Sequence, residues 1–183
     1  MKSIIKNIFL IFYTSISFAQ IDGQIDSTFG VNGITFSNFS MGATGTSIGI
    51  DNQQNIFAVG QIYASNQYDF AAVKFNNQGT IDTTFGVNGK FTIGFGIDDF
   101  CNSIAIQTDN KIILGGYSST WDGFNVNSIF TQISLIRLLN NGKVDSTFGT
   151  NGKFEFDLNP IDCGAVAIAL QSDGKIIAVG KYN

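Results

Sequence analysis

The stretch GTIDTTFGVNG at residues 79–89 decides the fold, because close copies of it occur elsewhere in the chain. The copies read GQIDSTFGVNG at 23–33 and GKVDSTFGTNG at 142–152, and seven of the eleven positions are identical in all three. They begin 56 and then 63 residues apart. A recurring period of this length is typical of repeat architectures. The sequence therefore predicts a tandem array with units of about 23–78, 79–141 and an incomplete 142–183.

Four short strands are predicted after each glycine turn. The first strands are expected at 34–37, 90–93 and 153–157, and the second strands begin at Ser47, Ser103 and Ala167. The third strands are 56–60, 112–116 and 176–180, and the fourth lie within 69–79 and 132–142, where Lys74 and Arg137 coincide. Asp-Asn and Asp-Gly pairs at 109–110 and 173–174 suit two-residue hairpins. In the first copy Gln53-Gln54 replaces them, so that hairpin is expected to be less secure.

The second and third strands are apolar or small on both alternating faces, so each sheet must be covered on both sides. Antiparallel four-stranded sheets that cover one another in tandem describe the blades of a β-propeller. A β-solenoid is the rival, but its coils are generally shorter and carry fewer hairpin turns. We expect an all-β fold, an incomplete propeller of about three blades whose last blade lacks its final strand. The glycine turn is expected to connect one blade to the next.

Three motifs together resemble the delta-60 repeat family of extracytoplasmic bacterial proteins. They are D-[ST]-T-F-G-x-N-G, Q-[ST]-D-[NG]-K-I-I and DFAAVKFNNQG, and the likeness covers Gly23 to Gly180. The resemblance implies a propeller-like fold and an exported protein, and it transfers no catalytic residue.

The third copy stops before its fourth strand, which leaves eleven strands and an exposed edge. Either further blades of a longer chain or other copies of this chain are needed to close the ring.

The first nineteen residues have the pattern of a secretory signal peptide. Lys2 and Lys6 precede an apolar run from Ile8 to Ile16, and Ser17-Phe18-Ala19 supplies small residues for cleavage. Residues 20–183 are then the repeat array, secreted, periplasmic or at the cell surface. Without Lys2 and Lys6, eight basic residues face fourteen acidic ones, so nucleic acid is a poor partner, and no later stretch could span a membrane.

The side chains that most catalytic sites use are scarce. Histidine is absent and Glu155 is the sole glutamate, which excludes a Ser-His-Asp triad and histidine-bearing metal sites. The repeated Asp26, Asp82 and Asp145 are expected to accept backbone hydrogen bonds in Asx turns. The residues assigned to these structural turns are Asp26, Phe29, Gly30, Gly33, Asp82, Phe85, Gly86, Gly89, Asp145, Phe148, Gly149 and Gly152.

Calcium is the most reasonable ion, because hard cations prefer oxygen ligands and the chain is rich in Asp and Asn. The local clusters are Asp98 with Asp99 and Asp51 with Asn55, although their spacing matches no known calcium motif. We therefore expect no cofactor, with calcium as the alternative. Cys101 and Cys163 precede the second strands of adjacent copies and could form a disulfide, although their offsets differ by two residues.

Seven extra residues in the second unit are the one asymmetric feature of the array. This loop offers Tyr117, Trp121, Asp122 and Phe124, an aromatic platform of the kind that a protein or glycan partner uses. The alternative is that Trp121 covers a blade edge. We expect a non-catalytic exported module for binding or cell-surface scaffolding. The rivals are a carbohydrate-binding or calcium-dependent adhesin and, less readily, an enzyme with Asp and Tyr in a propeller channel.

Overall fold

The computed structural model describes residues 23–39, 42–121, 129–157 and 162–182, and within these ranges the chain forms β-strands and no helix. The predicted signal peptide lies outside the described residues. The strands are β1 (Ala43–Ile50), β2 (Ile56–Ala64), β3 (Gln67–Phe75), β4 (Lys90–Ile93), β5 (Asp99–Ile106), β6 (Ile112–Trp121), β7 (Ile129–Leu138), β8 (Lys153–Phe156), β9 (Cys163–Leu170) and β10 (Ile176–Tyr182). In the described part of the chain no helix is long and apolar enough to cross a membrane.

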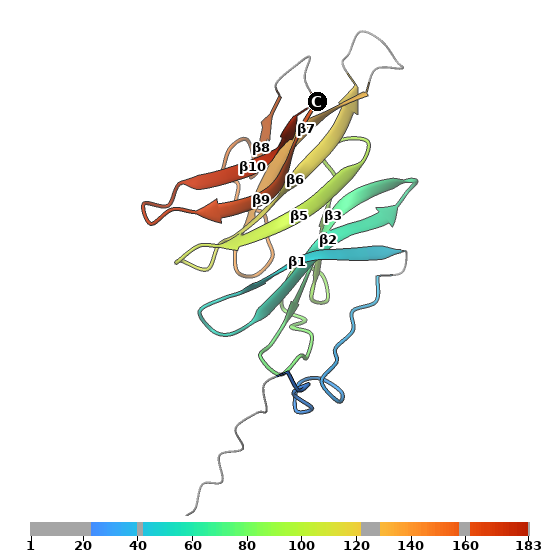
Figure 1. The fold of residues 1–183 in the computed structure, drawn as a ribbon, viewed down its shortest axis with the longest axis vertical. Helices are drawn as coiled ribbons and strands as arrows, with labels where there is room; N and C mark the ends of the chain where they lie inside the picture. Colours follow the sequence, from blue (N-terminus) through green and yellow to red (C-terminus); the bar gives the residue numbers. More distant parts are fainter. Residues whose placement is uncertain (1–22, 40–41, 122–128, 158–161, 183) are drawn as a thin grey trace, which may run out of the picture.

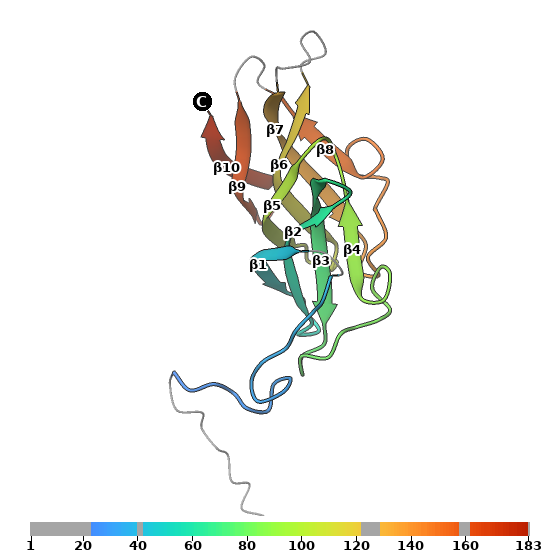
Figure 2. The ribbon, with the colours of Figure 1, turned by 90° about the vertical axis from the view of Figure 1, so that its right-hand side faces the viewer.

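The strands form three antiparallel sheets that follow one another along the molecule (Figures 1 and 2). Sheet 1 has the order β1-β2-β3-β4, sheet 2 the order β5-β6-β7-β8, and sheet 3 contains β9 and β10. Strand β5 packs against β1, β2 and β3, and β9 packs in the same way against β5, β6 and β7. This arrangement confirms the prediction of an all-β, partial β-propeller built from tandem four-stranded blades.

The sheets are out of phase with the sequence repeats. Strand β4 follows the second glycine turn, yet it pairs with β3 of the preceding repeat, and β8 pairs with β7 in the same way. The turn folds back because the Lys74 amide donates to the Gly89 carbonyl and the Asp82 amide donates to the Lys74 carbonyl. The glycine turn therefore lies inside a blade, and the prediction that it connects neighbouring blades is wrong. Residues 94–98 make that connection.

The strand predicted at 34–37 is extended but is not part of a sheet. It occupies the position that β4 and β8 occupy after their own glycine turns, where each pairs with the strand before the turn. The described residues provide no such strand for 34–37, and an isolated extended segment gains no ladder hydrogen bonds. Phe36 is accordingly exposed.

Equivalent positions in the three sheets are fixed by the strand register. Ile48 lies opposite Ala58, Ile104 opposite Leu114, and Ile168 opposite Ala178. A bulge recurs at the same place in β1, β5 and β9, and all three strands begin four residues before the predicted start. This register lets each side chain be compared with its counterparts in the other blades.

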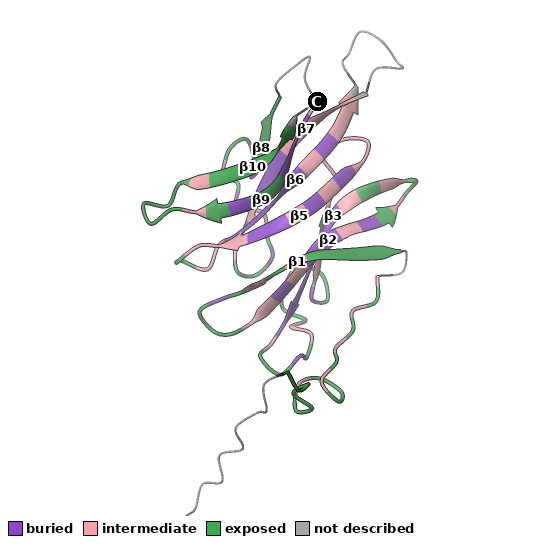
Figure 3. Cartoon of the chain, in the orientation of Figure 1, coloured by how far each residue is buried: buried purple, intermediate pink, exposed green. Residues whose placement is uncertain are grey.

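The core lies between successive sheets (Figure 3). Between sheets 1 and 2, Phe57 and Phe70 pack with Ile104, Ile112 and Leu138. A smaller cluster between sheets 2 and 3 contains Ile113, Leu135 and Ile168. Each buried sheet face thus excludes water only because the next sheet lies on it, which is the packing expected of propeller blades.

The hairpin at 51–55, expected to be less secure, is closed by its own side chains. Gln54 adopts a positive φ of 63°, and its equivalents Asn110 and Gly174 in the other two copies have φ of 61° and 84°. The Asp51 carboxylate accepts hydrogen bonds from the amides of Gln53 and Asn55 and from the Asn55 side chain. The buried Asp51 therefore supports a turn that Gln-Gln alone would not favour.

Candidate binding surface

A row of aromatic rings crosses from sheet 1 to sheet 2. Tyr63 and Tyr68 face each other across the β2–β3 hairpin with centroids 5.1 Å apart, and Tyr68 lies 5.1 Å from Phe100 on β5. Phe100 stacks on Tyr117 of β6 at 5.0 Å with an interplanar angle of 22°. We call Tyr63, Tyr68, Phe100 and Tyr117 the aromatic row. Tyr63 and Tyr68 are partly exposed, so the row reaches the molecular surface.

The row ends against sheet 3. A Cβ atom built on Gly164 of β9 would lie 3.0 Å from the Tyr117 Cβ and 3.2 Å from its Cγ, so a larger residue there would have to displace this side chain. Burial, with a smaller contribution from the nearby Asp98 charge, raises the pKa of Tyr117. The aromatic row therefore extends over sheets 1 and 2 and contacts sheet 3 at its Tyr117 end.

The sequence predicted only Tyr117 of these four rings as a binding residue. The sequence contained a pattern that could have indicated the Tyr63–Tyr68 pair, the Ser65-Asn66 dipeptide between them. This dipeptide forms a two-residue hairpin turn with φ of 52° and 67°. Such a turn places its flanking residues opposite each other. Trp121 ends β6, and its side chain is not described, while Asp122 and Phe124 lie outside the described residues.

The backbone at one end of the row is held by an aspartate between blades. The Asp98 carboxylate, at the end of the connection that leads into sheet 2, accepts a hydrogen bond of 2.9 Å from the Tyr68 amide of sheet 1. Asp162 repeats this bond one blade later, accepting from the Thr131 amide at 2.8 Å. Asp98 therefore positions the aromatic row.

Asp99, its neighbour in the predicted calcium cluster, is fully buried. Its carboxylate accepts hydrogen bonds from the amides of Phe95 and Gly96. Burial raises the pKa of Asp99 to about 6; the Asp69 carboxylate raises it further, and these two amides and Lys153 oppose the change. Asp98 and Asp99 thus serve different backbone contacts, and no group of three or more carboxylates or cysteines suited to a metal ion occurs among the described residues.

The repeated turn aspartates bind within their own turns. Asp26, Asp82 and Asp145 each accept a hydrogen bond of 2.6 Å from the hydroxyl of the threonine two residues later and another from its amide. The threonine hydrogen bonds are the largest cause lowering the pKa of each of these aspartates. The Asp82 carboxylate also pairs with Lys74 at 3.1 Å, and that of Asp145 with Arg137 at 2.9 Å, which explains why a cation recurs at this position.

The glycines of the turns permit backbone conformations and close contacts that other residues would not. Gly30, Gly86 and Gly149 have φ of 57°, 54° and 51°, and a Cβ atom at any of them would lie within 2.3 Å of a backbone oxygen. Gly33, Gly89 and Gly152 also have positive φ. Phe85 is buried in the core and meets Phe57 edge-on, and Phe29 and Phe148 are half-buried. The residues that are identical in the three turns therefore have structural roles within the fold.

Both cysteines are free and buried, so the disulfide that the sequence allowed is not formed. The strand register shows the reason: Cys101 lies opposite Gly116 and is equivalent to Ala165, whereas Cys163 is equivalent to Asp99. Cys101 faces the core between sheets 1 and 2. The Cys163 thiol instead contacts the Phe156 carbonyl of sheet 2.

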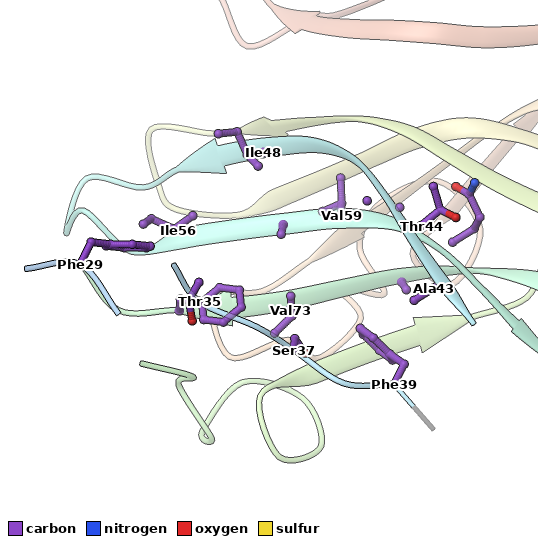
Figure 4. A pocket seen from close by; sticks show the side chains of 16 residues that line it. Phe29, Thr35, Ser37, Phe39, Ala43, Thr44, Ile48, Ile56, Val59 and Val73 are labelled. Atoms are coloured by element: carbon purple, nitrogen blue, oxygen red, sulfur yellow. The ribbon is translucent and has the colours of Figure 1, made fainter. Parts of the chain in front are cut away.

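An apolar groove of about 470 Å³ lies on the outer face of sheet 1 (Figure 4). Its floor includes Ile48, Ile56 and Val73, and the segment that carries Thr35 and Phe39 runs along one side. The groove offers no titratable side chain, so it suits an apolar occupant better than a polar substrate.

Two segments of the chain, 55–85 and 107–148, match a family model described as "Domain of unknown function (DUF5122) beta-propeller". The matched segments cover β2, β3 and the first part of the second glycine turn, and then β6, β7 and the first part of the third turn. This similarity supports a β-propeller repeat family. No curated protein matches the sequence.

Proposed function

We propose that this chain is an exported, non-catalytic β-propeller module that binds a protein partner through the aromatic row. The observation that carries the proposal is the continuous line of rings from Tyr63 to Tyr117, partly exposed and fixed by two blades. Tyrosine is favoured at protein interfaces because its ring is large and rigid and its hydroxyl can bond.

A protein partner suits the row better than a glycan does. Sugars stack on open ring faces, but Tyr68 and Phe100 each have a ring neighbour on two sides, so mainly ring edges and hydroxyls are available. Edges and hydroxyls are the groups that protein backbones and side chains contact readily. The glycan-binding adhesin is therefore the second candidate.

The non-catalytic part of the proposal is supported by the roles of the carboxylates. Asp26, Asp82 and Asp145 bind in turns, Asp51 closes a hairpin, and Asp98 holds the Tyr68 amide. Carboxylates that accept hydrogen bonds from the backbone in this way stabilise turns and strand ends, which is a structural role. Export is proposed from the signal-like sequence at 1–19.

The proposal is tested by placing a photo-crosslinking amino acid at Tyr63 and, as a matched control, at Phe154, a similarly exposed aromatic on β8. Irradiation of the source cells should give a protein adduct at position 63 and not at 154, and Tyr68→Ala should remove it. Equal adducts at both positions, or none, would overturn the proposal. Glycan-array binding that is lost in Tyr63→Ala would instead support the adhesin, as would a thermal shift on adding calcium.

A further inference from the structure

Sheet 2, which lies between the other two sheets, packs through two different apolar faces. We call face A the side that meets the preceding sheet and face B the side that meets the following one. On face A of sheets 2 and 3, Ile104 and Ile168 are 9 % and 8 % exposed. On face B of sheets 1 and 2, Phe57 and Ile113 are fully buried. Blade packing is therefore always face A on face B.

The contact between the faces repeats in part. In each interface a glycine of face B lies against the face A isoleucine of the next sheet, although Gly49 of β1 and Gly115 of β6 stand at different positions of their sheets. A Cβ atom on Gly49 would be 3.2 Å from the Ile104 Cδ1, and one on Gly115 would be 2.8 Å from the Ile168 Cγ2. Polar bonds repeat too: Thr46 donates to the Cys101 carbonyl, and Asn102 donates to the Ala165 carbonyl. One packing mode thus generates both interfaces.

In the described structure, face A of sheet 1 and face B of sheet 3 have no further sheet packed on them. Ile48, the face A equivalent of Ile104 and Ile168, is 69 % exposed on sheet 1. Ile177, the face B equivalent of Phe57 and Ile113, is 49 % exposed on sheet 3, and Val179 beside it is 62 % exposed. Leaving such side chains in water forgoes about 1.5–3 kcal/mol each.

The groove on sheet 1 has the shape of a vacant blade position. Thr35 and Phe39 line one side of this groove. Their equivalents after the next glycine turn, Phe91 and Phe95, lie in the same way beside face A of sheet 2. In that inner interface the corresponding space is filled by Phe57 and Val59 of the preceding blade. What fits this groove is therefore the face B surface of a β-hairpin.

We infer that two copies of this chain associate head to tail, with β9 and β10 of one copy packed on face A of sheet 1 in the other. The chain itself carries both complementary surfaces, and the association continues the interface already formed between its own sheets. Because the two surfaces differ, the contact is heterologous and adds copies until a ring closes.

The test is the native mass of the full chain and of two single variants. Ile48→Asp changes only face A and Val179→Asp only face B, both at exposed positions, and Val87→Asp adds the same charge to an exposed turn residue as the control. The unmodified chain and Val87→Asp should assemble to multiples of the protomer. Each face variant alone should be monomeric and should keep the unmodified β-sheet circular dichroism spectrum.

Mixing the two face variants is the decisive measurement. Each retains the surface that the other lacks, so the mixture should form a one-to-one dimer and nothing larger. A monomeric unmodified chain at about 100 µM, a concentration well above a micromolar Kd, would overturn the inference. So would a Val179→Asp variant that still assembles, because that result would mean that face A pairs with itself.

Discussion

The Tyr68 amide lies 2.9 Å from the Asp98 Oδ1 atom, a hydrogen bond between sheet 1 and the connection that leads into sheet 2, and Thr131 and Asp162 form the same bond at 2.8 Å one blade later. Both aspartates stand directly before the first strand of their blade. A single acidic residue at this position therefore fastens each blade to the one before it.

Replacing Asp98 by alanine should lower the free energy of unfolding by roughly 1 kcal/mol, because a hydrogen bond to a charged acceptor is lost at a partly exposed site. Asp98→Asn keeps an acceptor oxygen and should lose less. Urea denaturation followed by tyrosine fluorescence measures both. Equal losses in the two variants would indicate that the carboxylate charge, and not the bond to Tyr68, stabilises the contact.

The glycine turn provides a second prediction, on steric grounds. In Gly86→Ala the new Cβ atom would lie 2.1 Å from the Lys90 carbonyl oxygen, whereas at Gly174, which also has positive φ, nothing lies within 4 Å. Gly174→Ala should cost only the left-handed strain of about 1–2 kcal/mol, and Gly86→Ala about 3 kcal/mol or more. Thermal unfolding of the two variants compares them. Similar losses would mean that backbone strain alone explains the invariant glycine.

The sequence predicts the parts of this fold that depend on contacts between residues close together in the chain, and it does not predict those that depend on distant residues. The turn residues were predictable because the Thr84 amide donates to the Asp82 carboxylate and the Gly89 amide donates to the Phe85 carbonyl, all within a few positions. The assignment of strands to blades was not predictable, because β4 pairs with β3 only when the glycine turn folds back. No local sequence pattern indicates this fold-back. The repeated cation at 74 and 137 was noticed, and its ion pair with the turn aspartate gives the physical reason.

The candidate site was predicted only in part for the same reason. Tyr117 could be singled out, but in a predicted loop that the structure shows to be part of β6 as far as Trp121. Its neighbour Phe100 is paired with it by strand register, and Tyr68 meets Phe100 across two blades. Contacts of this kind depend on how sheets stack. Hydrophobic periodicity within a strand carries no information about them.

Asp99 should make stability depend on pH in a defined direction. Its folded pKa of about 6 lies above the ordinary value of 3.8, so between these values the folded protein holds a proton that the unfolded chain releases. The stability contributed by the protonated form is complete below pH 4 and is lost as the pH rises through 6. Asp99→Asn should remove this dependence.

The measurement is the Tm of both proteins from pH 4 to pH 7.5. The difference between the unmodified chain and Asp99→Asn should shift in favour of the variant as the pH rises. Asp69 and Lys153 are the same in both proteins, so the comparison reports on the replacement of the Asp99 carboxyl. A difference that stays constant with pH would contradict the raised pKa.

The two cysteines should remain reduced and should react only after unfolding. Burial raises the pKa of Cys101 to about 12, so almost none of it is thiolate, the reactive form, at neutral pH, and Cys163 is shielded from reagent by its burial. Iodoacetamide without a reductant should add no mass to the native chain and two adducts to the chain in guanidinium chloride. Cys101→Ser and Cys163→Ser should each leave one adduct under denaturing conditions. A denatured chain that accepts no adduct would reveal a disulfide, and a single fast adduct on the native chain that disappears in Cys163→Ser would show that this thiol is open to solvent.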